Sequence, residues 1–233
     1  MKNAPIGIFD SGSGGLTTLD SCRSLLPNEN YIYVSDARPD GWGGLTEANI
    51  ARRASECVDK LLSCGCKAVV AACNTATEVG IGLLRDNYSV PFVGLEPALK
   101  PAVRAFPDGK ILVLCTPATA RQTKFKELLS CCDNAHIKVR PQPELAKKIE
   151  KNLYDLDVLL PEVEHIIEAD KPDAIVLGCT HYVFLRHMFE RIAGADKVFD
   201  GNGGAARRLK SILAERGLLC DRKNAGAVEF HKI

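Results

Sequence analysis

The sequence predicts an α/β fold with two pseudo-symmetric domains, each an open, mostly parallel sheet with helices on both faces. Short runs of Val, Ile and Leu recur along the 233 residues, and each is followed by an amphipathic stretch of helical length. Unbroken apolar runs of this kind are typical of parallel strands covered on both faces. An internal repeat indicates two domains, and small polar residues after the strands indicate an active site in the cleft between them.

The expected strands are residues 6–9, 31–34, 68–72, 92–95, 111–114, 137–139 and 174–177. Helical patterns lie between them, among them residues 16–26, residues 46–64 and a stretch that ends near residue 87. Because strands and helices alternate, we expect parallel neighbours joined by helical crossovers. A C-terminal helix is expected after about residue 203.

The repeat pairs two strands with two others. Residues 68–75 (AVVAACNT) align with residues 174–181 (AIVLGCTH), an offset of 174 − 68 = 106. Residues 6–11 (IGIFDS) align with residues 111–116 (ILVLCT), an offset of 111 − 6 = 105. Chance remains the alternative explanation. A duplication predicts one domain of residues 1–96 with 203–233 and another of residues 97–202.

The composition excludes several classes of protein. The 30 basic and 29 acidic residues leave a net charge of +1, which argues against a nucleic-acid partner bound mainly through its phosphates. No apolar run approaches the roughly 18 residues of a membrane span, and the N-terminus lacks the pattern of a signal peptide. We therefore expect a cytoplasmic protein without membrane contact.

The ten cysteines are expected to be reduced thiols in that compartment. Their spacing does not resemble a zinc site, since Cys64 and Cys66 are separated by one residue and Cys131 and Cys132 are adjacent. We therefore predict no metal. Most of these cysteines are interpreted as small buried apolar residues.

Two of the cysteines occupy matched positions in the repeat. Cys73 and Cys179 each follow a predicted strand, where ligands of parallel α/β sheets bind. Facing each other across a cleft, one thiolate can take a proton from a carbon acid while the other thiol returns one on the opposite face, which inverts that carbon. A helix N-terminus after each cysteine is expected to lower the thiol pKa toward neutrality. The alternative is two buried structural cysteines.

Beyond these features, six blocks resemble the glutamate racemases of the aspartate/glutamate racemase family in order and separation. They are residues 6–17 (IGIFDSGSGGLT), 71–77 (AACNTAT), 94–102 (GLEPALKPA), 115–119 (CTPAT), 178–182 (GCTHY) and 198–213 (VFDGNGGAARRLKSIL). The resemblance covers essentially the whole chain. It implies a cofactor-independent interconversion of L- and D-glutamate, which supplies D-glutamate for peptidoglycan. The oligomeric state, a homodimer included, stays open.

The resemblance also implies residue roles. Cys179 would take the α-proton from L-glutamate and Cys73 from D-glutamate, with Asp10 and His181 flanking the thiols. Glu150 aligns as a further assisting carboxylate, although a solvated Glu on a helix face is an equal alternative. The implied substrate contacts are Ser11, Asn74, Thr75, Thr116, Thr119 and Thr180, and a loop with Gly41, Trp42 and Gly43.

That loop departs from the family pattern. Gly41 stands where the family usually has proline, and Trp42 where it has tyrosine. Glycine loosens the backbone and restores an N–H donor, and we expect Trp42 to cover the substrate as a larger lid. Another departure, Val183 in place of proline, should change only a local turn. The altered loop leaves the choice of substrate side chain open.

Other readings of the sequence remain. The chain could be a racemase of another amino acid such as aspartate, or a binding protein that kept the cleft without catalysis. Residues 10–15 (DSGSGG) could cradle a phosphate before a helix, but they lack both the dinucleotide-binding and the P-loop spacing. Lys100 could carry pyridoxal phosphate, yet no phosphate-binding pattern accompanies it. We predict no organic cofactor.

Overall fold

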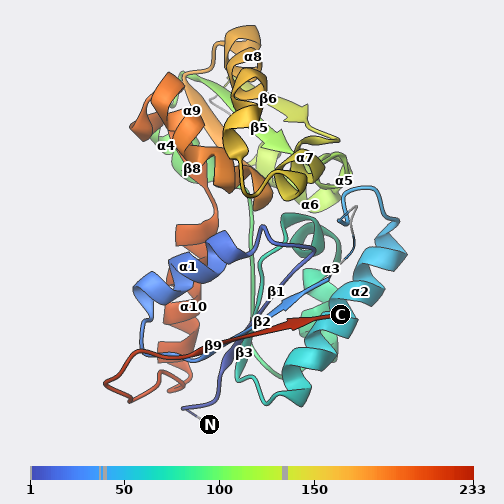
Figure 1. The fold of residues 1–233 in the computed structure, drawn as a ribbon, viewed down its shortest axis with the longest axis vertical. Helices are drawn as coiled ribbons and strands as arrows, with labels where there is room; N and C mark the ends of the chain where they lie inside the picture. The colour runs from blue at the N-terminus through green and yellow to red at the C-terminus, as the bar shows by residue number, and fades with distance from the viewer. Residues whose placement is uncertain (1, 37, 39–40, 133–135) are drawn as a thin grey trace.

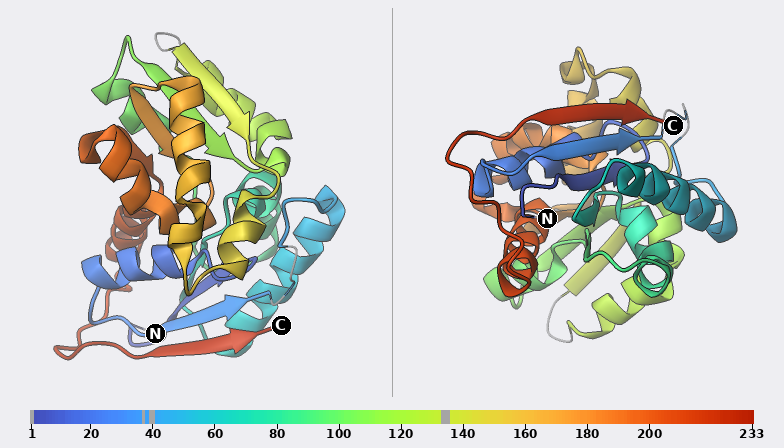
Figure 2. Two further views of the ribbon diagram at one scale, coloured as in Figure 1. Left: turned by 45° about the horizontal axis from the view of Figure 1, so that its top comes forward. Right: turned by 90° about the horizontal axis from the view of Figure 1, so that it is seen from below.

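The computed structural model describes residues 2–36, 38, 41–132 and 136–233. The elements form two parts, one above the other in Figure 1, and the left view of Figure 2 shows the same division from another side. Figure 1 places both chain ends in the lower part. The described helices include none that is long and apolar enough to cross a membrane.

The first part contains a five-stranded sheet in the order β4-β3-β1-β2-β9, with every neighbouring pair parallel. Its elements are β1 (Ile6–Asp10), α1 (Leu16–Leu25), β2 (Tyr31–Ser35), α2 (Glu47–Ser63), β3 (Ala68–Ala71), α3 (Asn74–Asn87), β4 (Phe92–Gly94), α10 (Asn202–Glu215) and β9 (Val228–Lys232). One face of the sheet packs against α1 and α10, and the other packs against α2 and α3.

The second part contains a four-stranded parallel sheet in the order β6-β5-β7-β8. Its elements are α4 (Leu99–Ala105), β5 (Lys110–Cys115), α5 (Pro117–Arg121), α6 (Thr123–Ser130), β6 (His136–Pro141), α7 (Leu145–Lys151), η1 (Leu156–Leu159), α8 (Leu160–Asp170), β7 (Ala174–Leu177), η2 (His181–Leu185), α9 (Arg186–Ala193), η3 (Ala195–Lys197) and β8 (Val198–Asp200). One face packs against α4 and α6, and the other against α7, α8 and α9.

The two sheets repeat one topology. Read in reverse, the second order is β8-β7-β5-β6, which corresponds strand by strand to β4-β3-β1-β2. In the first sheet, β2 lies on one side of β1, and β3 and β4 lie on the other side, so the strand order reverses between β1 and β3. The second sheet has the same reversal between β5 and β7. In open parallel sheets, ligands bind at the carboxyl ends of the strands beside such a reversal. Each part therefore offers one half of a site, and the predicted fold class is confirmed.

Three features differ from the sequence-based expectations. The strand β8 was not expected, because it has only three residues. The strand β9 at the edge of the first sheet was not expected, because its side chains are mostly exposed and form no apolar run. Cys179 does not open an α-helix: Thr180 follows it and the 3-10 segment η2 begins at His181, ahead of α9. The expectation of a helix N-terminus at both thiols is wrong for Cys179.

A buried carboxyl group lies on α3, where this helix faces α6. Glu78 is 7% exposed, and neither of its oxygens has a hydrogen-bond partner among the described residues. Burial raises the pKa of Glu78 to about 7; Lys124 opposes this shift and Glu96 adds to it. Since this pKa is raised on folding, the free energy of unfolding should fall as the pH rises from about 4.5 to about 7.

Glu78→Gln keeps the shape of the side chain without a charge to bury. We expect the variant to exceed the parent in stability at pH 8 by roughly 1–3 kcal/mol, with most of this gain absent below pH 4.5. Urea unfolding of both proteins at pH 4 and pH 8 measures the difference. An equal difference at the two pH values would contradict the argument, because only the ionised form carries the penalty.

Candidate active site

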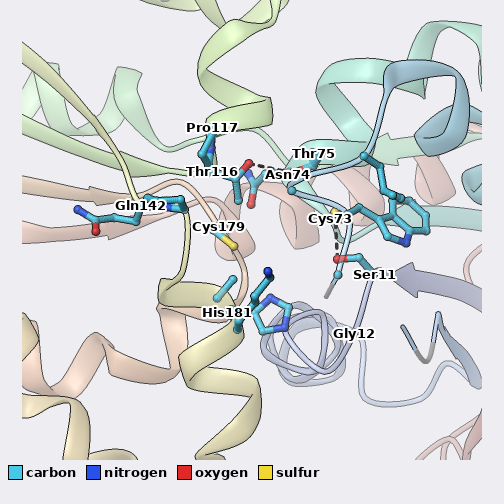
Figure 3. Close-up of a pocket in the computed structure, with 18 of the residues that line it drawn as sticks. Ser11, Gly12, Cys73, Asn74, Thr75, Thr116, Pro117, Gln142, Cys179 and His181 are labelled. Carbon is cyan, nitrogen blue, oxygen red and sulfur yellow. Dashed lines mark hydrogen bonds between the residues drawn. The ribbon is translucent and has the colours of Figure 1, made fainter. Parts of the chain in front are cut away.

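A cavity of about 560 Å³ lies where the carboxyl ends of the two sheets meet. Ser11 and Cys73, which follow β1 and β3, line it from the first part. Thr116 and Cys179, which follow β5 and β7, line it from the second part (Figure 3). Matched strand ends of the repeated topology thus bring the two thiols to one cavity.

Cys73 is the N-cap residue of α3. Its sulfur accepts a hydrogen bond from the backbone N–H of Ala76 and, as a neutral thiol, donates one to Ser11 Oγ, each at 3.5 Å. Burial and the nearby Asp10 carboxyl raise the pKa of Cys73 to about 12, although hydrogen bonds that the thiolate would accept from Ser11 and Ala76 oppose the shift. The expected shift toward neutrality is therefore wrong for Cys73, because desolvation outweighs the helix N-terminus. Without substrate this residue is a neutral thiol.

Cys179 stands in a different environment. It is 7% exposed and lies two residues before His181. Burial alone would lower the pKa of His181, but its interactions with Cys179, Glu150 and Asp10 outweigh burial and raise this pKa to about 10. At neutral pH the imidazole is therefore a cation, hydrogen-bonded to Glu150.

Glu150, on α7, lies on the far side of His181. Its Oε2 accepts hydrogen bonds from His181 Nε2 and Ser13 Oγ, both at 2.7 Å. Burial would raise the pKa of Glu150, but the hydrogen bonds from His181 and Ser13 bring it down to about 2. Glu150 is thus an anion in contact with His181 rather than a solvated residue on a helix face.

Asp10 lies behind the cavity and does not line it. Its side chain is fully buried, and it accepts hydrogen bonds from Gly12 N at 3.0 Å and Thr180 Oγ1 at 3.4 Å. Burial raises the pKa of Asp10, while His181 and backbone N–H groups oppose the shift. Asp10 therefore raises the pKa of Cys73 through its charge, and its hydrogen bond to Gly12 supports the loop after β1.

Most of the expected substrate contacts line the cavity: Ser11, Asn74, Thr75, Thr116 and Thr180. Thr119 does not, because it is fully buried and hydrogen-bonded to the hydroxyls of Thr116 and Thr75 at 3.1 and 3.5 Å. Its expected direct contact with the substrate stays a prediction, because Thr119 lies behind Thr75 and Thr116 and not in the cavity lining. Thr75 and Thr116 come from different parts and are joined at 3.1 Å.

The loop before α2 anchors Trp42 in the core. Trp42 is 1% exposed, its ring lies 6.4 Å from that of Phe9, and its Nε1 donates to Asp36 Oδ2 at 2.6 Å. Trp42 nevertheless lines the cavity together with Gly41 and Gly43, so its contact with the substrate stays a prediction. Gly41 adopts a positive φ of 57° that favours glycine. Residues 37, 39 and 40 of this loop lie outside the described residues.

The glycines of residues 10–15 allow a close approach between the two parts. A Cβ on Gly14 would lie 2.6 Å from both His181 Nδ1 and Thr180 Oγ1, and 2.8 Å from the backbone N of His181. A Cβ on Gly12 would lie 3.2 Å from His181 Nε2. The loop of residues 10–15 therefore packs against Thr180 and His181, in the segment that follows Cys179. This close packing leaves no space for a phosphate at Gly12 and Gly14. The described residues also hold no group of three or more His, Cys, Asp or Glu suited to a metal ion.

Sequence reasoning missed several residues of this site. Ser13 was interpreted only as part of a glycine-rich loop, although it contacts Glu150. The cavity rim also carries three cations that the sequence did not single out, Arg38, Arg121 and Lys147. No local signal identified them, because each comes from a different loop or helix end.

Comparison with known proteins places the chain in a family. A model of the Asp/Glu/Hydantoin racemase family matches residues 21–209. The chain belongs to this family. A glutamate racemase of Clostridium perfringens is 38% identical over 99% of this chain and 91% of its own length.

Solved structures of racemases share the fold along nearly the whole chain. A glutamate racemase of Bacillus anthracis superimposes with a TM-score of 0.84 at 28% identity, covering 100% of this chain and 89% of its own. The Escherichia coli glutamate racemase, solved with L-glutamate and the activator UDP-MurNAc-Ala, gives a TM-score of 0.85 at 30% identity, with coverages of 97% and 88%. The resemblance seen in the sequence and the α/β fold class are both confirmed.

Proposed function

We propose that this racemase-family chain interconverts L- and D-glutamate by removing the α-proton with one of the two thiols, Cys179 or Cys73, and returning a proton to the opposite face from the other. The observation that carries the proposal is that two thiols from matched strand ends line one cavity. Relatives named as glutamate racemases, 36–38% identical over nearly the full chain, support glutamate as the substrate.

In the L-to-D direction, the Cys179 thiolate takes the α-proton, and the electron pair stays on the substrate as a carbanion conjugated with the carboxylate. The neutral thiol of Cys73 then delivers its proton to the opposite face and becomes the thiolate. Because its pKa is raised, Cys73 carries a proton at the start, which is the state that a proton donor needs. The His181 cation balances charge on Cys179 at the start, and the reverse direction exchanges the two thiols' roles.

The polar groups around the cavity would orient the substrate. Asn74 Nδ2 donates to Leu95 O at 2.9 Å, whereas its buried Oδ1 has no partner among the described residues. This oxygen would accept a hydrogen bond from the substrate ammonium group. Ser11, Thr75, Thr116 and Thr180 would bind the α-carboxylate and ammonium, and the backbone of Gly41, Trp42 and Gly43 the side-chain carboxylate.

Several wider statements belong to the same proposal. The chain would fold as two domains, residues 1–96 with 203–233 and residues 97–202. It would act in the cytoplasm, as a monomer or homodimer, without metal or organic cofactor. Its product would be D-glutamate for peptidoglycan.

Incubation with L-glutamate in D₂O tests the function. We expect loss of the α-proton signal by NMR and a fall of optical rotation to zero, since both enantiomers form with deuterium at Cα. The same result should follow from D-glutamate. Dialysis against EDTA before the assay should leave the rate unchanged.

L-Aspartate, one carbon shorter, serves as the matched substrate control. Exchange with aspartate and none with glutamate would contradict the assignment of substrate. No exchange with either, despite binding of glutamate by calorimetry, would indicate a non-catalytic binding protein.

A further inference from the structure

Ser13 lies outside the set of residues used by the proposed mechanism, yet it bridges the two parts of the molecule. It belongs to the loop between β1 and α1, and its Oγ donates to Glu150 Oε2 at 2.7 Å. Its backbone N–H points to the same oxygen at 3.3 Å. Glu150 belongs to α7 of the second part, 137 residues along the chain. One residue thus supplies two donors to a carboxylate across the molecule.

The carboxylate that Ser13 binds is the one that holds His181. Glu150 Oε2 also accepts the hydrogen bond from His181 Nε2 at 2.7 Å, and His181 lies two residues after Cys179 in the segment that lines the cavity. Hydrogen bonds therefore run from Ser13 through Glu150 to His181. Glu150 is ionised, so both of these bonds are stronger than neutral ones.

Glu150 depends on this support because of its position. Its side chain is 34% exposed, and α7 has only seven residues. In the described part of the chain, its hydrogen-bond partners are Ser13 and His181. Without Ser13, His181 alone would have to hold the Glu150 side chain, which has three rotatable bonds. The orientation of the His181 ring would then loosen with that of Glu150.

We propose that Ser13 is a positioning residue, which orients Glu150 so that this carboxylate holds the His181 imidazolium against Cys179. The proposal rests on the proposed racemase function. Because Ser13 and Glu150 come from different parts, the arrangement around Cys179 is complete only when the two parts are in contact. Cys73, which contacts neither residue of this pair, has no such requirement.

Ser13→Ala tests the proposal, since it removes the hydroxyl and keeps the backbone N–H. Ser13 is half-buried in a loop, so the variant should fold. We expect kcat for glutamate racemisation to fall about tenfold, which is the effect of one charge-assisted hydrogen bond. Ser13→Thr keeps a hydroxyl and should recover most of the rate. Ser21→Ala removes a hydroxyl that bonds only within α1, to Thr17 O, and should change nothing.

A purely structural role of Ser13 would not move the titration of His181, so that titration is the deciding measurement. The charged and titratable groups facing His181 are Cys179, Glu150 and Asp10. In the parent, ¹H–¹⁵N NMR of labelled histidine should give a pKa of about 10 for His181. In Ser13→Ala this pKa should fall by about one unit, because the anion beside the ring is less well placed.

A double-mutant cycle with Glu150→Ala tests the route of the effect. If Ser13 acts through Glu150, Ser13→Ala should add little in the Glu150→Ala background. An unchanged pKa of His181 in Ser13→Ala, or fully additive effects on that pKa, would overturn the proposal. The NMR titrations need no substrate, so they decide on Ser13 even if the chain fails to racemise glutamate.

Discussion

Replacing either Cys73 or Cys179 by serine should lower kcat for racemisation by about 10²–10⁴-fold, the usual contribution of a general acid or base. Serine is close to cysteine in size, and both positions are nearly buried, so the fold should persist. A serine hydroxyl is a far weaker acid than a thiol. It gives up a proton to the carbanion much more slowly, and at neutral pH it is not ionised to the alkoxide that could take a proton from the substrate.

The two variants should fail in different ways, because each thiol serves one face of the substrate. Cys73→Ser keeps the Cys179 base and should exchange the α-proton of L-glutamate in D₂O without forming D-glutamate. Cys179→Ser should exchange only D-glutamate. Proton NMR combined with chiral chromatography separates exchange from inversion.

Cys115→Ala is the matched control for these variants. Cys115 ends β5, is fully buried and does not line the cavity, so its removal should cost some stability and leave kcat nearly unchanged. An equal loss of activity in Cys115→Ala, or exchange of the opposite enantiomers in the two serine variants, would show that the thiols have been assigned wrongly.

The parts of the fold that the sequence predicted are those encoded by local patterns. Strands such as β7 (Ala174–Leu177) are unbroken apolar runs, and their burial on both faces follows directly from that composition. The pairing of Cys73 with Cys179 was predictable because the internal repeat aligns two strands and also the residues that directly follow them. Two copies of one topology then bring equivalent strand ends together.

The parts that could not be predicted depend on contacts between distant residues. Trp42 lies in a glycine-rich loop, and it is buried by tertiary contacts, among them those with Phe9 and Asp36. The pKa of Cys73 depends on how completely the folded chain excludes water, which no motif records. The role proposed for Ser13 depends on its hydrogen bond to Glu150, which lies 137 residues away in the sequence.

Gly14→Ala should reduce kcat/KM by about 100-fold while the protein remains folded. The added Cβ would lie 2.6 Å from His181 Nδ1 and 2.8 Å from the His181 backbone N, closer than real Cβ contacts allow. Because one of these atoms is backbone, a rotamer change cannot relieve the clash. The segment from Cys179 to His181 must move away from the loop that carries Ser11, and a displacement of about 1 Å can cost a reaction about 10²-fold.

A graded series separates this effect from a general loss of stability. Gly12→Ala places its Cβ 3.2 Å from His181 Nε2, a contact the ring can relieve by a small shift, so we expect a loss of only a few-fold. At Gly82, inside α3, a Cβ would meet nothing within 4 Å, and Gly82→Ala should gain up to about 1 kcal/mol in stability without loss of rate. Steady-state kinetics and urea unfolding of the three variants supply both quantities. Full activity of Gly14→Ala would contradict this prediction. It would show that catalysis proceeds with a larger distance between residue 14 and His181 than the structure has.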